Sequence, residues 1–142
     1  MAALEDARAR DLPVVYANDN RGVWDGDAAR LVRQATEEGI GGELVAAIAP
    51  QAGDRFVVKP RYSAFDHTPL ELILHDLEIE RILLAGAATE GCVVQTAING
   101  RELGFKISVL VDACASADAR HEQIALVYLE EVVGVRLVRT GS

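Results

Sequence analysis

Short apolar runs alternate along this chain with charged segments that have the length and pattern of helices. The apolar runs predicted to be strands are residues 13–17, 56–58, 81–85, 107–112 and 135–138. Apolar runs without polar alternation are typical of parallel strands whose two faces are both covered. Helices are predicted at residues 4–10, 27–38, 69–75, 92–103 and 118–132, with a short helix or loop at 43–48.

Repeated strand–helix–strand units with right-handed crossovers build a three-layer α/β/α sandwich around a mainly parallel, Rossmann-like sheet. The chain has 142 residues, a length for which one compact domain is the default, so we predict a single domain over residues 1–142. Ligands of such sheets bind beyond the carboxyl ends of the strands. The residues that this prediction places there are Asp19, Lys59, 88–92 and 112–116.

Several of the predicted helix ends carry recognisable signals. Thr68 is predicted as an N-cap, with Pro69 at the first helical position and Glu71 completing a capping box. Gly104 is expected to end the helix at 92–103, and the glycine-containing stretch 39–42 to end the one at 27–38.

Composition excludes several classes of partner. The formal net charge is −8 and no Lys/Arg cluster occurs, so nucleic acid is not an expected partner. No apolar run approaches the roughly 20 residues that span a bilayer, and residues 1–10 lack the apolar core of a secretory signal. Cys92 and Cys114, the two cysteines, suit a reducing compartment and lack zinc-site spacing. We therefore predict a soluble cytoplasmic protein without membrane partner, metal or other cofactor.

Cys92 is the strongest candidate for chemistry. It follows a predicted buried strand and opens a helix, where unpaired backbone N–H groups favour a thiolate. The N–H groups of Ala88 and Cys92 are candidates for an oxyanion hole, and Lys59, at another strand end, for a nearby ammonium. From spacing alone, the alternative is equally open: Cys92 as a small buried helix residue and Lys59 as a solvated strand end.

Two sequence blocks, at 59–65 and 86–93, are more specific than the spacing of single residues. KPRYSAF at 59–65, followed by Thr68 and Leu70, precedes G-x-A-T-x-x-C-V at 86–93 and Thr96–Ala97. Together with YANDN at 16–20, Trp24 and DACAS at 112–116, these blocks resemble the signature of isochorismatase-like cysteine hydrolases over nearly the whole chain.

The resemblance implies a sheet of six parallel strands and an Asp–Lys–Cys triad that hydrolyses amides of small molecules through an acyl-enzyme. Cys92 and Lys59 match two positions of that triad, and the peptide bond Ala87–Ala88 corresponds to one that is cis in the family. For the substrate pocket we single out Asp19, Trp24, Phe65 and Thr89. The alternatives are that Asp19 caps the turn after its strand and that the aromatic residues pack ordinarily.

The chain departs from the family pattern in ways that change the expected function. No counterpart of the third triad residue, an Asp in a motif like I-D-M-Q, precedes Leu4. The family strand that ends in this Asp is central, between the strands at 13–17 and 81–85, so a first strand is expected to be missing. Turnover is then expected to be impaired, and the open slot with the apolar stretch 92–98 predicts a homo-oligomer.

Two further departures concern the substrate. Metal-binding nicotinamidases have a His two residues after the position of Asp19, where this chain has Arg21, so a metal ion is not expected. Isochorismate-cleaving members lack the nucleophilic cysteine, so Cys92 indicates an amidase acting on a small molecule. The alternative function is a catalytically silent module that retains the fold for binding or oligomerisation. Cys114 is expected to be buried and inert.

Overall fold

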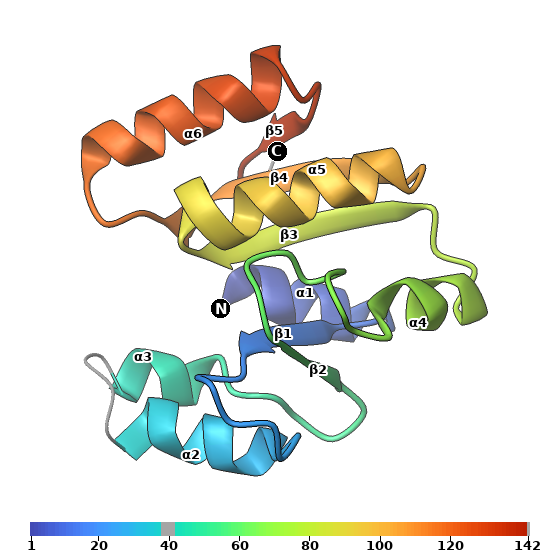
Figure 1. The fold of residues 1–142 in the computed structure, drawn as a ribbon, viewed down its shortest axis with the longest axis vertical. Helices are drawn as coiled ribbons and strands as arrows, with labels where there is room; N and C mark the ends of the chain where they lie inside the picture. Colours follow the sequence, from blue (N-terminus) through green and yellow to red (C-terminus); the bar gives the residue numbers. More distant parts are fainter. Residues whose placement is uncertain (38–41, 142) are drawn as a thin grey trace. The chain divides into compact units, whose positions relative to one another are not determined.

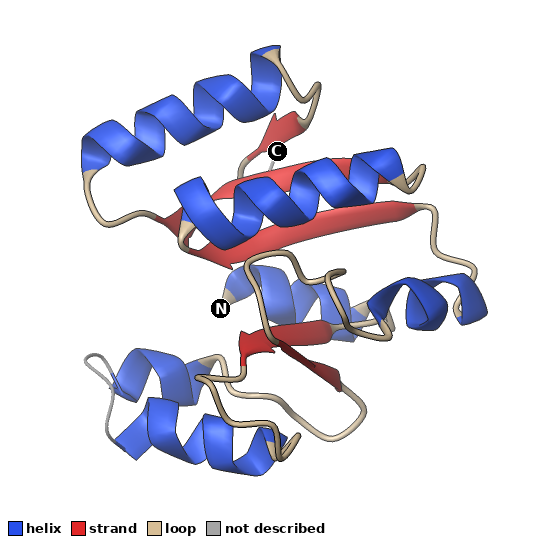
Figure 2. Cartoon of the chain, in the orientation of Figure 1, coloured by secondary structure: helices blue, strands red, loops and turns tan. Residues whose placement is uncertain are grey.

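The computed structural model describes residues 1–37 and 42–141, and the chain divides into two compact units, Met1–Pro60 and Arg61–Ser142. Figures 1 and 2 show helices and strands in alternation within both units. All described strand pairs are parallel, which confirms the predicted α/β fold with parallel strands. The single domain over residues 1–142 stays a prediction.

The first unit carries a two-stranded sheet. Its elements are α1 (Ala2–Ala9), β1 (Val15–Asp19), α2 (Ala28–Glu37), α3 (Gly42–Ala47) and β2 (Arg55–Lys59). β1 and β2 pair in register from Val15 opposite Arg55 to Asp19 opposite Lys59. The carboxyl ends of both strands therefore lie at the same edge of this sheet.

Tyr16 anchors β1 within the first unit. Its ring stacks on Phe56 of β2 with centroids 6.2 Å apart, and its hydroxyl donates to the carbonyl oxygen of Ile48 at 2.6 Å. The Arg8 guanidinium of α1 donates to the Tyr16 hydroxyl at 3.1 Å and pairs with the Asp54 carboxylate, whose pKa it lowers. The contacts of Tyr16 are thus those of a packing residue.

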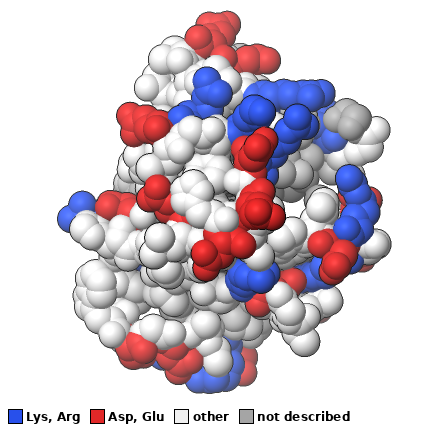
Figure 3. All heavy atoms as spheres, turned by 90° about the vertical axis from the view of Figure 1, so that its right-hand side faces the viewer, with Lys and Arg blue, Asp and Glu red and all other residues white. Residues whose placement is uncertain are grey.

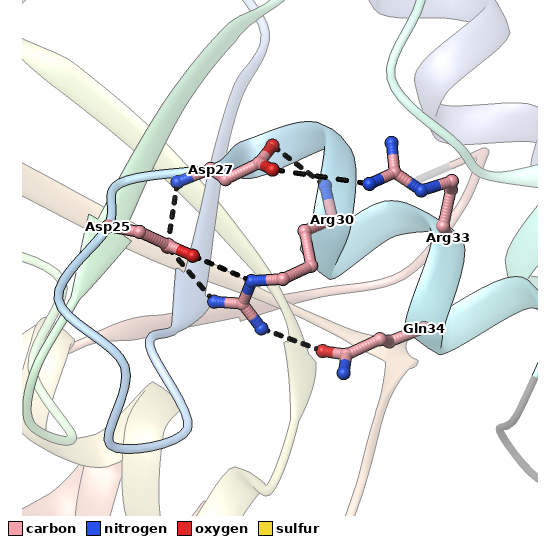
Figure 4. Close-up of polar contacts among 5 residues, drawn as sticks. All are labelled: Asp25, Asp27, Arg30, Arg33 and Gln34. Carbon is pink, nitrogen blue, oxygen red and sulfur yellow. Dashed lines mark hydrogen bonds and ion pairs between the residues drawn. The ribbon is translucent and has the colours of Figure 1, made fainter.

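A polar network fixes the start of α2 (Figure 4). The Arg30 guanidinium donates to both carboxylate oxygens of Asp25, at 2.9 and 3.1 Å, and this pairing lowers the pKa of Asp25. Asp27 accepts the backbone N–H of Arg30 at 2.9 Å, which is the contact of an N-cap side chain. The helix begins one residue after Asp27, as its capping role requires.

The second unit carries a three-stranded sheet in the order β3-β4-β5. Its elements are α4 (Leu70–Asp76), β3 (Arg81–Ala87), the π-helical turn η1 (Thr89–Val93), α5 (Val94–Glu102), β4 (Lys106–Ala115), α6 (Ala119–Glu131) and β5 (Arg136–Val138). Figure 1 shows α5 and α6 on one face of this sheet. The side chains of Ala97, Val109 and Leu129 are fully buried and form the centre of its core.

Among the described strands, β1 pairs only with β2, and β3 pairs on one side only, with β4. The described strands therefore form two sheets, whereas one sheet was predicted. The family strand predicted to be missing lies between the counterparts of β1 and β3, and both β1 and β3 are edge strands here.

Most element boundaries agree with the prediction to within two residues, but several differ. β4 extends to Ala115, so Asp112 lies inside a strand, where its carboxylate accepts the backbone N–H of Thr140. The helical segment predicted from residue 92 begins at Thr89. The N-cap of α4 is Pro69 instead of Thr68, although the Thr68 hydroxyl still accepts the N–H of Leu70 at 3.2 Å. The predicted end of the helix at 27–38 lies largely outside the described residues.

Charged residues of both signs lie close together on the face shown in Figure 3. Among the described helices, none has the length and apolar composition needed to cross a membrane.

Candidate active site

Lys59 ends β2 and is buried, with 4% of its surface exposed. Its carbonyl oxygen accepts the backbone N–H of Asn20 at 2.9 Å, and its strand position is opposite Asp19. A buried lysine is rare unless it has partners, because removing an ammonium from water is costly. The solvated strand end that sequence alone left open is thus wrong for Lys59.

Asp19 forms the turn that follows β1. One of its carboxylate oxygens accepts the backbone N–H of Arg21 at 2.6 Å, and the side-chain oxygen of the buried Asn20 accepts that of Gly22 at 2.9 Å. Such side-chain acceptors two residues before the donor are typical Asx turns. The turn-capping alternative for Asp19 is therefore confirmed, while a substrate contact stays a prediction.

Trp24 lies in the loop between β1 and α2 with 79% of its surface exposed. A large aromatic side chain is seldom so exposed in a core-packing role, because burial of its ring is strongly favourable. Ordinary packing within its own unit does not account for Trp24, and a role at a binding surface remains a prediction.

Cys92 lies in η1, the turn between β3 and α5. The peptide bond Ala87–Ala88 that leads into this turn is cis, as the resemblance predicts. The backbone at Ala88 is extended, and its carbonyl oxygen accepts the N–H groups of Gly91 and Val93, at 3.2 and 3.3 Å. These two hydrogen bonds close the turn that contains Cys92, and the Cys92 side chain is partly exposed. Cys92 is therefore at the start of a helical segment and accessible, as a nucleophile requires.

Thr89 opens the same turn and is completely buried. Its hydroxyl has no hydrogen-bond partner among the described residues. Buried hydroxyl groups normally form hydrogen bonds, so the Thr89 hydroxyl, three residues before the candidate nucleophile, is an exception. This burial fixes the turn and leaves the role of Thr89 toward substrate a prediction.

Glu90 is a residue of this turn that sequence reasoning missed. Its carboxylate accepts the backbone N–H of Ala117 at 3.3 Å, and the nearby Ser116 hydroxyl is the main cause that lowers its pKa. These contacts tie η1 to the segment between β4 and α6. In the sequence, Glu90 occupies an unspecified position of the G-x-A-T-x-x-C-V block, which gave no signal of this contact.

Phe65 packs inside the second unit. Its ring stacks on Phe105 with centroids 5.8 Å apart. Phe65 and Ile107 also pack closely against α5 at Gly100. A Cβ atom at this glycine would lie 3.1 Å from the Phe65 ring and 2.8 Å from the Ile107 side chain, so the close packing requires glycine. These contacts of Phe65 are those of an ordinary packing residue. The place of Phe65 in a substrate pocket stays a prediction.

Cys114 differs from Cys92 in its surroundings. It lies in β4 opposite Gly86, and burial raises the pKa of the Cys114 thiol. A raised pKa leaves less thiolate near neutral pH, and the thiolate is the reactive form. The second cysteine is therefore poorly suited to act as a nucleophile, but it is only partly buried, whereas the sequence predicted a buried residue.

No group of three or more His, Cys, Asp or Glu side chains that could hold a metal ion occurs within residues 1–37 and 42–141. The candidate residues fall into two sets: Asp19, Trp24 and Lys59 in the first unit, and Phe65, Ala88, Thr89 and Cys92 in the second. The strands bring Asp19 together with Lys59, and η1 brings Thr89 together with Cys92.

Comparison with known proteins defines the family. A family model described as "Isochorismatase domain" matches residues 2–139. The chain is 32% identical to the "Uncharacterized isochorismatase family protein YaaI" of Bacillus subtilis over 129 residues, which are 91% of this chain and 71% of that protein. The chain therefore belongs to the isochorismatase domain family, as the sequence resemblance predicts.

Two other relatives have more specific names. The ureidoacrylate amidohydrolase RutB of Klebsiella pneumoniae is 40% identical over 93 residues, which cover 65% of this chain and 39% of that protein. The crystal structure of N-carbamoylsarcosine amidase from Thermoplasma acidophilum superposes with a TM-score of 0.76 at 31% identity. That match covers 99% of this chain and 80% of the amidase, and it confirms the isochorismatase-like fold.

Proposed function

We propose that this isochorismatase-family protein hydrolyses a carbon–nitrogen bond in a small, non-peptide amide, with Cys92 as the nucleophile. The observation that carries the proposal is the turn at residues 88–93, in which Cys92 is partly exposed within the first turn of a helical segment. The family membership of the chain supports the same chemistry.

The reaction proceeds in two balanced steps. The Cys92 thiolate attacks the amide carbonyl carbon, a thioester forms, and the carbon–nitrogen bond breaks as the amine leaves with the proton that the thiol gave up. Water then attacks the thioester, which releases the carboxylic acid and regenerates the thiol. Both steps pass through a tetrahedral oxyanion, for which the N–H groups of Ala88 and Cys92 are the proposed donors.

Lys59 is the proposed source of positive charge beside the thiolate. Its ammonium is held at the end of β2 and is buried, so water screens its field weakly. An ammonium placed near the sulfur stabilises the thiolate relative to the thiol. The approach of Lys59 to Cys92 is part of the proposal, since the two residues belong to different units.

The substrate class is proposed from the relatives. Two of them are named as a ureidoacrylate amidohydrolase and an N-carbamoylsarcosine amidase. The compounds in both names carry a carbamoyl group on nitrogen. We therefore expect small carbamoyl or ureido compounds to be better substrates than peptides. Asp19, Trp24, Phe65 and Thr89 are the proposed pocket residues.

The test is hydrolysis of a panel of small amides, carbamoyl compounds and short peptides by the wild type and by Cys92→Ala. The proposal expects release of ammonia or amine from the small compounds by the wild type only. A Cys92→Ala variant that folds normally and turns over as fast as the wild type would refute it. An inert thiol together with absent turnover would instead favour a silent binding module.

Two accompanying proposals concern setting and assembly. Cys92 and Cys114 are present as thiols and not as a disulfide in this structure, which suits a reducing, cytoplasmic compartment. We also propose a homo-oligomer, which the exposed apolar side chains of the second unit support.

A further inference from the structure

Helix α6 exposes an apolar stripe. Four large apolar side chains on α6 and at its C-cap are 42–67% exposed: Ile124, Val127, Tyr128 and Val132. They recur at spacings of three and four residues, so they share one side of the helix. The adjoining side is used for packing, because Ala125 and Leu129 are buried. The stripe therefore extends the apolar surface of α6 beyond its packed side, and no described residue covers it.

A shallow hollow accompanies the stripe. Ile124 and Tyr128 line it on α6, and Glu90 and Val94 line it on the neighbouring segments η1 and α5. A second apolar depression continues along α6 over Val127 and Val132. The exposed side chains thus border a continuous strip of the second unit, of the kind into which another helix can pack.

Three exposed charges on α6 run against its dipole, although its N-cap Asp118 and the first-turn Glu122 do not. Arg120 is exposed in the first turn, and Glu130 and Glu131 are exposed in the last turn, which contains no basic residue. A helix is stabilised by acidic groups at its N-terminus and basic groups at its C-terminus, so these positions are unfavourable for the isolated chain. Within the described residues, neither Arg120 nor Glu131 forms an ion pair.

An antiparallel copy of the same helix complements both features. We propose that α6 packs against α6 of a second copy of this chain about a twofold axis near the middle of the helix. This arrangement sets Arg120 of one copy beside Glu131 of the other, and Ile124 beside Val127. Each contact then occurs twice, as an isologous interface requires. This proposal rests on the homo-oligomer proposed above and identifies α6 as the interface between its copies.

The occupant is a second copy because the stripe is complementary to itself. Arg120 at one end of the stripe meets Glu131 at the other end only when the helices run in opposite directions, and the apolar centre then meets an apolar centre. Burial of Ile124, Val127 and Tyr128 provides the main attraction, since exposed ion pairs contribute little to affinity and more to the choice of partner and orientation.

The test is a charge exchange on α6, measured by sedimentation velocity over a concentration series of the full chain. Arg120→Glu and Glu131→Arg each place like charges opposite one another twice, so each should weaken self-association by about 10-fold or more. The double variant Arg120→Glu/Glu131→Arg restores opposite charges and should recover wild-type association to within about 3-fold.

The design separates assembly from folding. Both substitutions place charges in favourable positions relative to the helix dipole, so loss of association in the single variants would not reflect a weakened helix. Arg120 and Glu131 lie roughly 16 Å apart along the axis, too far to interact directly within one copy. A matched control is Leu72→Lys on α4, which adds charge at an exposed apolar residue outside the stripe, whereas Ile124→Lys should abolish association.

Each outcome decides a different claim. A wild type that stays monomeric at all concentrations overturns this inference together with the proposed oligomer. Association that survives Ile124→Lys overturns the α6 surface alone, and failure of the double variant to recover overturns the antiparallel pairing. Hydrolysis of small amides is measured separately, so its absence would bear on the proposed function and leave the interface intact.

Discussion

Asp19 and Lys59 stand opposite each other at the ends of β1 and β2. The Asp19 carboxylate holds the following turn through the Arg21 N–H, and the Lys59 carbonyl oxygen accepts the N–H of Asn20. The backbone of this strand end is thus fixed on both sides. A lysine held in this way has a defined position within the first unit.

The first prediction concerns Lys59. In Lys59→Ala the positive charge is lost, so the pH midpoint of Cys92 alkylation by iodoacetamide should move to higher pH and kcat/KM for a small amide should fall by about 10²–10³. Lys59→Arg keeps the charge and should shift the midpoint less. The control Lys106→Ala removes an exposed lysine of β4. An unchanged alkylation profile in Lys59→Ala would exclude the proposed role.

The second prediction concerns Glu90. The Ser116 hydroxyl and the Ala117 N–H lower its pKa in the folded protein, so its contribution to stability is present above the ordinary carboxyl pKa and is lost as the pH falls through the lowered value. The wild type should therefore be more stable than Glu90→Gln above the ordinary carboxyl pKa, and this difference should close as the pH falls below it. Chemical unfolding at a series of pH values measures it.

Glu5→Gln is the control for this experiment, since Glu5 is an exposed acid of α1 whose side chain forms no hydrogen bond to any described residue. Its stability difference from the wild type should show no comparable change with pH. If Glu90→Gln behaves like Glu5→Gln, the contact between η1 and the segment before α6 does not form in solution.

The third prediction concerns the core of the second unit. Leu129 of α6 is completely buried, so Leu129→Ala should lower the free energy of unfolding by about 2–5 kcal/mol through lost burial and a residual cavity. Leu72→Ala, at a leucine of α4 that is 70% exposed, should change it by less than about 0.5 kcal/mol. Equal effects of the two variants, measured by urea unfolding, would contradict the described packing.

The strands and helices were largely predictable because apolar runs and capping residues are local signals. Gly104 follows α5 with a positive φ of 93°, as the sequence predicts, and Asp118 caps α6 by accepting the N–H groups of Arg120 and His121. The extension of β4 to Ala115 was not predictable in this way. Its last residues are polar or small, and their pairing with β3 depends on the partner strand.

The candidate site was predictable only in part. Cys92, Lys59 and the cis peptide bond followed from the resemblance in the blocks at 59–65 and 86–93. The contact of Glu90 with Ala117 joins residues 27 positions apart, and the burial of Thr89 depends on tertiary packing. Neither has a local signature, because both arise where η1 meets other parts of the second unit.

The most direct test of the account is mass spectrometry of the protein quenched during turnover of a small carbamoyl compound. The account predicts an acyl adduct on Cys92 in the wild type and in Cys114→Ala, and its absence in Cys92→Ala. Burial raises the pKa of the Cys114 thiol, so that residue should stay unmodified near neutral pH. An adduct that maps to Cys114, or turnover that persists in Cys92→Ala, would contradict the assignment of Cys92 as the nucleophile.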